Sequence, residues 1–416
     1  MAKFFAEKFP PGFFDVTQDV SRTLPVDIID RWTKNPQSLD AARQLLDPNR
    51  LEGIVVCSDS AGLTRMTANR GLLEILALID RPKQLIQAYG SAIGGQAVGI
   101  WAADNTEMFY PHGIRAGDVV SMLLAVRDRI GKECEVHVGF GAHYGHFYRL
   151  GDGLYGASAD RVERIAEEFT EGGEIVITSD LAAHLDPRSG YAFAPRPDIP
   201  AAYGSNLRVV DGPRCQQSDP PIARYPIPYS DKFYADLLRF ANQPDDAQLL
   251  EEVTANYSRL RAVVLLERES DDSDSPEIAV LNELALSLAM RKIGGALIAK
   301  FDGLESKTSG VIGIYTFAEC ASALAFARRF REALAEQQIA CRAAIDYGDV
   351  LIFQLSGGLE DVAGLPVNIA SKLAQDKGVF GKIYVSDRAA RNLHEYSGFH
   401  RTTFNLAGVI IEAMMD

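Results

Sequence analysis

The sequence has 416 residues, which is too long for one ordinary domain and suits two domains with connecting segments. Its composition, 47% hydrophobic and 24% charged, is that of a globular protein, and the net charge of −14 argues against a nucleic-acid-binding surface. No apolar run reaches the ~18 residues that cross a bilayer, and the N-terminus lacks the apolar segment of a signal peptide. The five cysteines show no CxxC spacing and indicate reduced thiols. We therefore expect a cytoplasmic protein.

Residues 1–50 are expected to form a helical N-terminal extension, and residues 51–210 a first domain. In this domain the hydrophobic pattern predicts strands and helices in alternation. The predicted elements are, in chain order, a strand at 53–57, a helix at 71–89, a hairpin formed by 96–101 and 106–110, a helix at 116–130, a strand at 134–142 and a helix at 157–169.

Residues 211–258 form a predicted linker, because prolines crowd 211–227 and a helical pattern follows at 231–258. Residues 259–416 then repeat the first domain. The sequence Gly-Glu-Ile-Val-Ile at 173–177 returns 208 residues later as Gly-Lys-Ile-Tyr-Val at 381–385, and Ser-Asp follows in both, at 179–180 after Thr178 and at 386–387 directly. The order β-α-β-β-α-β in each half predicts an α+β fold with two ferredoxin-like sheets, each covered by helices on one face.

Two aspartates of the first domain are candidate metal ligands. Asp59 leaves the first predicted strand before a small turn, where a carboxylate can bind Mg²⁺ and free N–H groups at 62–64 can face a polyphosphate. An aspartate at a strand end is also a common helix cap. Asp104 lies at the tip of the predicted hairpin, where Asp-Asn is a common turn sequence. Only a hairpin that lies antiparallel beside the first strand brings the two carboxylates together.

These segments resemble a class III adenylyl/guanylyl cyclase domain, whose first metal motif reads F-x-D-I-x-G-F-T. Residues 57–64 keep the Asp, Gly and Thr of this motif, and the resemblance extends over roughly 51–190 and again over 260–416. The family fold implies two domains paired face to face. The resemblance implies two ions, Mg²⁺ or Mn²⁺, held by Asp59, Asp104 and the backbone carbonyl of Ser60, with Gly62, Leu63 and Thr64 at the phosphates.

The second half resembles the partner domain that contacts the base and the ribose in this family. Residues 300–304 match a K-x-x-G-D hairpin with Leu304 at the metal position, and residues 361–368 match D-x-x-G-x-x-V-N. The resemblance implies base contacts from Lys300 and Asp361, which suit adenine, a ribose contact from Asn368, and charge stabilisation by Lys372 where the family has Arg.

The two halves keep complementary parts of such a site. The first half has Ile100 and Gly153 where base readers are expected, and the second half has Glu267 and Leu304 at the metal positions. We infer one competent site, with metals from the first half and base and ribose contacts from the second. Its degenerate counterpart is a candidate site for a small-molecule effector.

The sequence therefore predicts an adenylyl cyclase, a phosphorus–oxygen lyase that forms 3′,5′-cyclic AMP and pyrophosphate from ATP by two-metal catalysis. We expect a monomer with intramolecular domain pairing, and neither a nucleic-acid partner nor a membrane span. The alternative is a catalytically silent homologue that binds a nucleotide as a sensor or scaffold. Lys372 and Ala407, which replace a family Arg and Lys, favour that alternative. The pair His143 and His146 has no third ligand for zinc.

Overall fold

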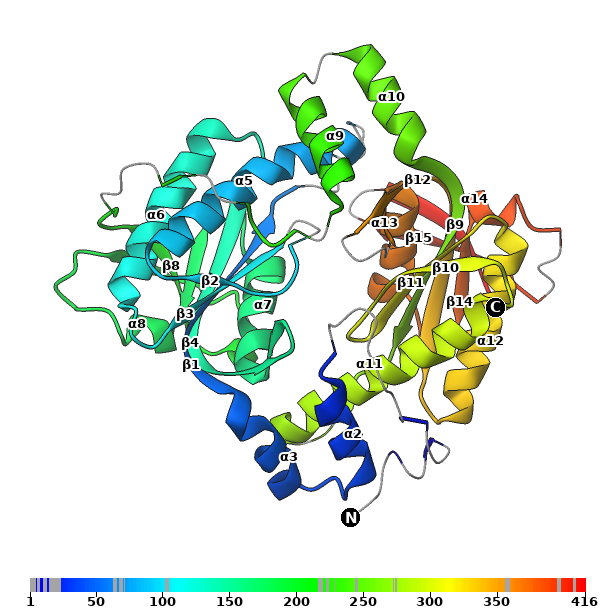
Figure 1. The fold of residues 1–416 in the computed structure, drawn as a ribbon, viewed down its shortest axis with the longest axis horizontal. Coiled ribbons are helices and arrows are strands. Elements are labelled where there is room, and N and C mark those ends of the chain that lie inside the picture. The colour runs from blue at the N-terminus through cyan, green and yellow to red at the C-terminus, as the bar shows by residue number, and fades with distance from the viewer. Residues whose placement is uncertain are drawn as a thin grey trace. The chain divides into compact units, whose positions relative to one another are not determined.

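The structure is a computed structural model of residues 1–416 (Figure 1). It describes residues 5, 8–9, 13–14, 24–62, 66, 70, 72–101, 105–215, 220–221, 224–227, 229–243, 246–271, 273, 275–355, 360–394, 398–406 and 409–416. Four predicted positions lie outside the described residues: Leu63, Thr64, Asp104 and Ala407.

The chain forms two compact units. The first unit comprises Leu46–Tyr229 and Tyr234–Pro244, and the second comprises Met1–Leu45, Ser230–Phe233 and Asp245–Asp416. Helix α9 (Asp231–Asn242) therefore contributes residues to both. Among the helices of the described residues, none combines the length and the apolar character needed to cross a membrane.

The first unit is built on an eight-stranded sheet. Its strands are β1 (Arg50–Ser60), β2 (Gln96–Ala97), β3 (Thr106–Pro111), β4 (Val138–Leu150), β5 (Gly153–Tyr155), β6 (Ile175–Thr178), β7 (Ala192–Pro195) and β8 (Asn206–Asp211). Its helices are η1 (Asp47–Asn49), α5 (Leu72–Ala92), α6 (Ala116–Glu133), α7 (Ala157–Phe169), α8 (Ser179–Ala182) and η2 (Ala201–Tyr203). The strand order is β2-β3-β1-β4-β6-β8-β7, and β5 pairs with β4.

The second unit repeats this sheet. Its strands are β9 (Ser258–Arg268), β10 (Gly303–Ser309), β11 (Ile312–Phe317), β12 (Cys341–Gln354), β13 (Glu360–Ala363), β14 (Ile383–Ser386), β15 (His400–Leu406) and β16 (Val409–Met415). Its helices are α2 (Val26–Lys34), α3 (Leu39–Leu46), α10 (Ala247–Tyr257), α11 (Pro276–Ile298), α12 (Cys320–Glu336), α13 (Leu365–Ser371), the π-helix η3 (Lys372–Asp376) and α14 (Asp387–Ala390). The order β10-β11-β9-β12-β14-β16-β15, with β13 on β12, confirms the predicted repeat and the mixed α+β fold.

The helices of the first unit cover both faces of the sheet, which corrects the expectation of a single covered face. Ile54 and Val56 of β1 belong to the core formed with α5 and α6, whereas Val55 and Cys57 belong to the core formed with α7. Successive side chains of a strand point to opposite faces. The unbroken apolar run of β1 is therefore the pattern of a strand buried on both sides (Figure 1).

The N-terminal helices α2 and α3 pack on the second unit, although in the sequence they precede the first. Trp32 of α2 is fully buried, and its indole N–H donates to Oδ1 of Asn282 in α11 at 2.9 Å. Ile29, one turn earlier on the same helix face, is also fully buried. The apolar stripe of α2 therefore packs against a helix that lies 250 residues away along the chain.

Candidate active site

Asp59 lies half-buried near the end of β1, beside the predicted hairpin. Strand β3 pairs antiparallel with β1, and the ladder ends at the pair Ser58 and Thr106, whose hydroxyl oxygens are 2.5 Å apart. Asp59 and Asn105 are the next residues of the two strands beyond this pair. The hairpin therefore lies antiparallel beside the first strand, which is the arrangement that the two-carboxylate hypothesis requires.

Of the three predicted phosphate contacts at 62–64, only Gly62 lies among the described residues, in the turn after β1. The N–H of Ala61 donates to the carbonyl of His137 at 2.9 Å, and Gly62 follows with a φ of 78°, a left-handed conformation that favours glycine. The N–H of Met66 donates to the carbonyl of Gly62 at 3.1 Å. Strand β1 thus ends in a turn at Ala61 and Gly62, just beyond Asp59 and Ser60.

The chemistry of these donors fits a hard divalent cation. A carboxylate from Asp59 and a backbone carbonyl from Ser60 are oxygen ligands of the kind that Mg²⁺ and Mn²⁺ take. Within the described residues, no group of three or more His, Cys, Asp or Glu side chains can hold a metal ion. The second carboxylate of the predicted pair is Asp104, which precedes Asn105 in the sequence.

The corresponding position of the second unit is already neutralised. Asp59 pairs across the sheet with Gly139 of β4, whereas Glu267, its counterpart on β9, pairs with Arg342 of β12. Nε and Nη2 of Arg342 lie 2.9 and 2.8 Å from Oε2 of Glu267, and the two side chains are only 15% and 14% exposed. A divalent cation at Glu267 would have to displace this guanidinium. At the register position opposite Asp59, β4 carries Gly139 in place of an arginine.

The structure corrects the position of the second hairpin. Strands β10 and β11 are joined at Gly310 and Val311, whereas the sequence placed the hairpin at 300–304. The pairing of the strands identifies equivalent residues in the two units. Ser58 pairs with Thr106 in the first unit, and its counterpart Leu266 pairs with Gly313 in the second. The predicted metal position Asp104, two residues before Thr106 in the sequence, therefore corresponds to Val311, two residues before Gly313, and not to Leu304. Both residues are apolar, so the inferred loss of a metal carboxylate is unchanged.

Lys300 lies exposed in the turn between α11 and β10. The K-x-x-G spacing that pointed to it occurs again seven residues later at Lys307 and Gly310. Lys307 stands on β10 just before the true turn, and β10 packs against β13, the strand that carries Asp361. The second occurrence of the spacing is the signal that identifies Lys307.

Asp361 is half-buried on β13, where it pairs with Phe353 of β12. Burial raises the pKa of the Asp361 carboxyl above its usual range, while the positive charge of Lys307 and a 2.8 Å hydrogen bond from the N–H of Val362 act in the opposite direction. Gly153 of β5, 208 residues earlier, pairs with Leu150 of β4 at the corresponding place. The second unit therefore has a carboxyl group, Asp361, near Lys307, at a position where the first unit has a glycine.

Asn368 and Lys372 lie four residues apart and are both half-buried. Asn368 belongs to α13, and Lys372 is the first residue of the π-helix η3. The corresponding helix of the first unit, α7, is α-helical throughout, and π-helical turns occur frequently at functional sites. Arg164, at the place of Lys372, forms a 3.5 Å ion pair with Glu168 and is 56% exposed, as expected of a surface salt bridge.

Acidic groups that the sequence analysis missed surround the end of β3. Burial and the nearby Glu163 raise the pKa of Glu107 to about 8. Burial, followed by the charges of Glu107 and Glu163, raises the pKa of the Cys57 thiol, so this cysteine is a protonated core residue. The side-chain amide of Asn105 donates to Glu167 of α7. The half-buried Glu107 is therefore mostly protonated at neutral pH.

His143 is a core histidine and not half of a zinc site. Its side chain is 3% exposed, its Nδ1 lies 2.9 Å from Oγ1 of Thr178, and burial lowers its pKa to about 4. His146, by contrast, is exposed.

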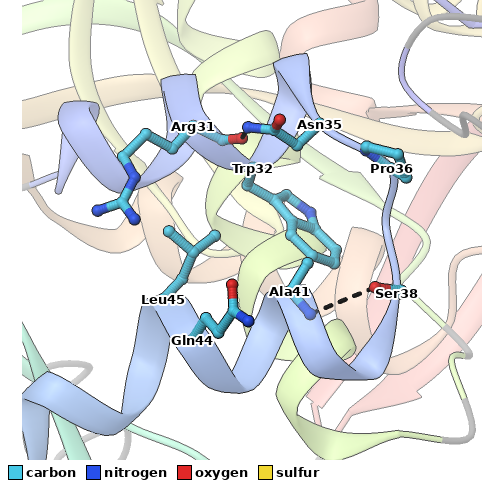
Figure 2. A pocket seen from close by; sticks show the side chains of 8 residues that line it. All are labelled: Arg31, Trp32, Asn35, Pro36, Ser38, Ala41, Gln44 and Leu45. Atoms are coloured by element: carbon cyan, nitrogen blue, oxygen red, sulfur yellow. Dashed lines mark hydrogen bonds between the residues drawn. The ribbon is translucent and has the colours of Figure 1, made fainter.

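A pocket of about 290 Å³ lies between α2 and α3, and its lining includes no predicted site residue. Figure 2 shows the Trp32 ring at its floor and a hydrogen bond from the N–H of Ala41 to Oγ of Ser38 at its rim. The lining consists of Arg31, Trp32, Asn35, Pro36, Ser38, Ala41, Gln44 and Leu45.

Comparison with known proteins gives matches among solved structures alone. No protein-family model and no curated protein matches the chain. A class III adenylyl cyclase-like ATP-binding protein from Pseudomonas aeruginosa has 11% sequence identity and a TM-score of 0.51, and the match covers 82% of this chain and 85% of that one. The adenylyl cyclase CyaB from P. aeruginosa has 18% identity and a TM-score of 0.34, with 40% of this chain and 96% of that chain covered. An adenylate/guanylate cyclase/hydrolase from Silicibacter pomeroyi has 24% identity and a TM-score of 0.32, with 38% and 96% covered. With its two equivalent eight-stranded sheets, the chain has the fold of the class III cyclases, present as two cyclase-type units in one polypeptide.

Proposed function

We propose that this protein is an adenylyl cyclase that forms 3′,5′-cyclic AMP and pyrophosphate from ATP, with both units contributing to one site. The complementary distribution of residues carries the proposal. Asp59 stands opposite Gly139, whereas its counterpart Glu267 is paired with an arginine. Asp361 has a cationic neighbour, whereas its counterpart is a glycine. Each unit thus keeps the half of a nucleotide site that the other lacks.

The reaction joins the ribose 3′-oxygen to the α-phosphorus, breaks the bond from that phosphorus to the pyrophosphate oxygen, and releases the hydroxyl proton to solvent. Two ions held by Asp59, Asp104 and the Ser60 carbonyl would supply activation of the hydroxyl and neutralisation of the phosphates. Asn368 orients the ribose by hydrogen bonding. Lys372 offers a positive charge to the phosphates where charge develops, without the planar fork of an arginine.

Adenine is the base that the second unit suits. A lysine can donate to a ring nitrogen and a carboxylate can accept from an exocyclic amine, whereas guanine carries a carbonyl where adenine has its amine. We assign the lysine to Lys307 and not to Lys300, because the charge of Lys307 is the one that acts on Asp361. The carboxylate form of Asp361 is the acceptor in this scheme.

A second candidate is a silent homologue that binds ATP without turnover. Lys372 favours it, because a lysine cannot bind a phosphate through two parallel hydrogen bonds as an arginine can. The neighbour with 11% identity that aligns with most of the chain is itself described as an ATP-binding protein. ATP binding is common to both candidates, and turnover separates them.

The test is incubation of the purified protein with Mn²⁺ and each nucleoside triphosphate, followed by identification of the products by mass spectrometry. We expect cyclic AMP from ATP, and its loss in Asp59→Ala. Asp186→Ala is the matched control, because Asp186 is an exposed carboxylate of the same unit and pairs with the exposed Arg188. ATP binding without a product would establish the silent homologue, and neither binding nor a product would contradict both candidates.

Mixing two inactive variants tests how the halves combine. Asp59→Ala removes a proposed metal ligand of the first unit, and Asp361→Ala removes a proposed base contact of the second. If the two units of one chain form the site, the mixture stays inactive, whereas restored activity would show that the units combine between chains.

A further inference from the structure

The ion pair between Glu267 and Arg342 extends to the segment that carries Lys372. Besides its two contacts with Glu267, Arg342 donates through Nη1 to the carbonyl of Gly378 at 2.6 Å. Its guanidinium carbon lies 4.7 Å from the centroid of the Phe380 ring. One largely buried side chain of β12 therefore joins a carboxylate of β9 to the loop that follows η3.

The backbone at Gly378 is fitted to this contact. Its N–H donates to the carbonyl of Ala374 at 3.1 Å, which closes the end of η3. A Cβ at this position would lie 2.3 Å from that carbonyl oxygen and 3.0 Å from Cδ of Arg342, so only glycine allows the approach. Leu373 and Ala374 fix the inner side of η3, because both are fully buried in the core against β9 and β12. The π-helix is thus held from the core and from its C-terminal end.

The first unit has neither the arginine nor the π-helix. Gly139 stands at the place of Arg342, and a Cβ there would lie 2.1 Å from Oγ1 of Thr170, which fills the space. Thr170 follows α7, the regular α-helix that corresponds to α13 and η3. Among the described residues, the arginine bridge and the π-helical turn therefore occur together in the unit that carries Lys372, and neither occurs at the corresponding positions of the first unit.

We propose that Glu267 and Arg342 are positioning residues for Lys372. The carboxylate at the former metal position holds Arg342, and Arg342 holds the C-terminal end of the turn whose first residue is Lys372. A guanidinium suits this task, because its rigid planar fork fixes the directions of several hydrogen bonds at once. This inference rests on the proposed function, in which Lys372 acts on the phosphates of the bound nucleotide.

Two variants test the bridge. Arg342→Lys keeps the positive charge and loses the planar guanidinium group, which donates several hydrogen bonds in fixed directions. The double variant Glu267→Leu/Arg342→Met removes both charges and leaves neither one buried alone, which protects folding. We expect kcat for cyclic AMP formation to fall about 10-fold or more in both, because small displacements of catalytic groups have effects of this size. KM for ATP should stay within about twofold. Amide exchange at 372–378 should accelerate.

Arg196→Lys is the matched control. Arg196 of the first unit joins the Glu174 carboxylate at 2.9 Å to the Phe169 carbonyl at 2.8 Å, so it loses the same kinds of bond away from the loop that follows η3. Its kcat and its exchange at 372–378 should match those of the wild type. Equal losses of kcat in the Arg342 and Arg196 variants would show general destabilisation and overturn the proposal, as would an unchanged kcat in both Arg342 variants.

Failure of the proposed function has a different signature. If the wild type makes no cyclic nucleotide, turnover is ruled out, and the positioning role is judged from amide exchange alone. Faster exchange at 372–378 in the double variant, with Arg196→Lys unchanged, would then support the bridge. Unchanged exchange in the double variant would overturn it.

Discussion

Tyr225 of the linker stacks on Trp101 of the first unit, with ring centroids 5.8 Å apart and planes inclined by 19°. The N–H of Trp101 donates to the carbonyl of Pro226 at 2.9 Å, and its carbonyl accepts from Nζ of the buried Lys83, also at 2.9 Å. Trp101 precedes Asp104 by three residues in the sequence. The linker is therefore part of the core that fixes the chain just before the predicted metal-binding loop.

Tyr225→Phe should destabilise the first unit by about 2 kcal/mol, because the hydroxyl donates to the buried carboxylate of Asp80 at 2.6 Å. The chain has two tryptophans, so urea unfolding in a Trp32→Phe background can be followed by Trp101 fluorescence alone. Tyr203→Phe is the control, since the Tyr203 hydroxyl accepts from Arg164 at an exposed site of the same unit and its loss should cost less than about 0.5 kcal/mol. Equal costs for the two variants would contradict a linker anchored at Asp80.

Asp59→Asn should weaken Mn²⁺ binding in the presence of a non-hydrolysable ATP analogue by about 10-fold or more, because the metal loses a charged ligand. Glu267→Gln should leave the Mn²⁺ affinity unchanged, since Arg342 already neutralises that carboxylate. Titration with Mn²⁺ followed by electron paramagnetic resonance measures both affinities. A loss of the same size in the two variants would mean that the second unit also binds a metal.

Lys307→Met should lower kcat/KM for ATP about 10- to 100-fold, because the proposed hydrogen bond to the base is lost. Lys300→Met should stay within about twofold of the wild type, because the charge of Lys307, and not that of Lys300, acts on Asp361. Initial rates with ATP, and with GTP as the competing base, give the comparison. A larger loss of kcat/KM in Lys300→Met than in Lys307→Met would indicate that Lys300 is the lysine that contacts the base.

The free energy of unfolding should fall as the pH rises from about 5 to 8. The folded protein keeps a proton on Glu107 up to about pH 8, whereas the unfolded chain loses it near 4.5. In this window the folded state binds the extra proton, so the slope is negative and at most about 1.4 kcal/mol per pH unit. Urea unfolding of Glu107→Gln at several pH values should show a flatter profile. If the unfolding free energy of Glu107→Gln fell with pH as steeply as that of the wild type, a group other than Glu107 would be the cause.

Lys372→Arg should raise turnover by about 10-fold if the protein is an active cyclase, because a guanidinium binds two phosphate oxygens at once. Lys377→Arg, at the other end of η3, is the control, because Lys377 is exposed and its replacement should not change kcat. Steady-state rates with saturating ATP measure both variants. A lower rate for Lys372→Arg would show that the π-helical turn is shaped for lysine.

Short-range patterns in the sequence predicted most of the fold. The repeated segments at 173–177 and 381–385 became β6 and β14, which hold the same place in the two sheets. The double coverage of β1 was missed, because the order of the elements does not show on which face of a sheet each helix packs; the unbroken apolar run of β1 was the signal for it. The hairpin of the second unit was misplaced, because K-x-x-G occurs twice between Lys300 and Gly310 and a linear motif carries no information on strand register.

By itself, the sequence determined that the chain is a tandem of two α+β units, and it identified Asp59, Asp361 and Lys372 as candidates, because each lies in or next to a short motif of consecutive residues. Only the tertiary structure decided that Lys307 is the cation near Asp361 and that Glu267 is neutralised. The second relationship joins residues 75 positions apart through the pairing of β9 with β12. Cross-strand partners are chosen by register, and register is set by the packing of the whole sheet.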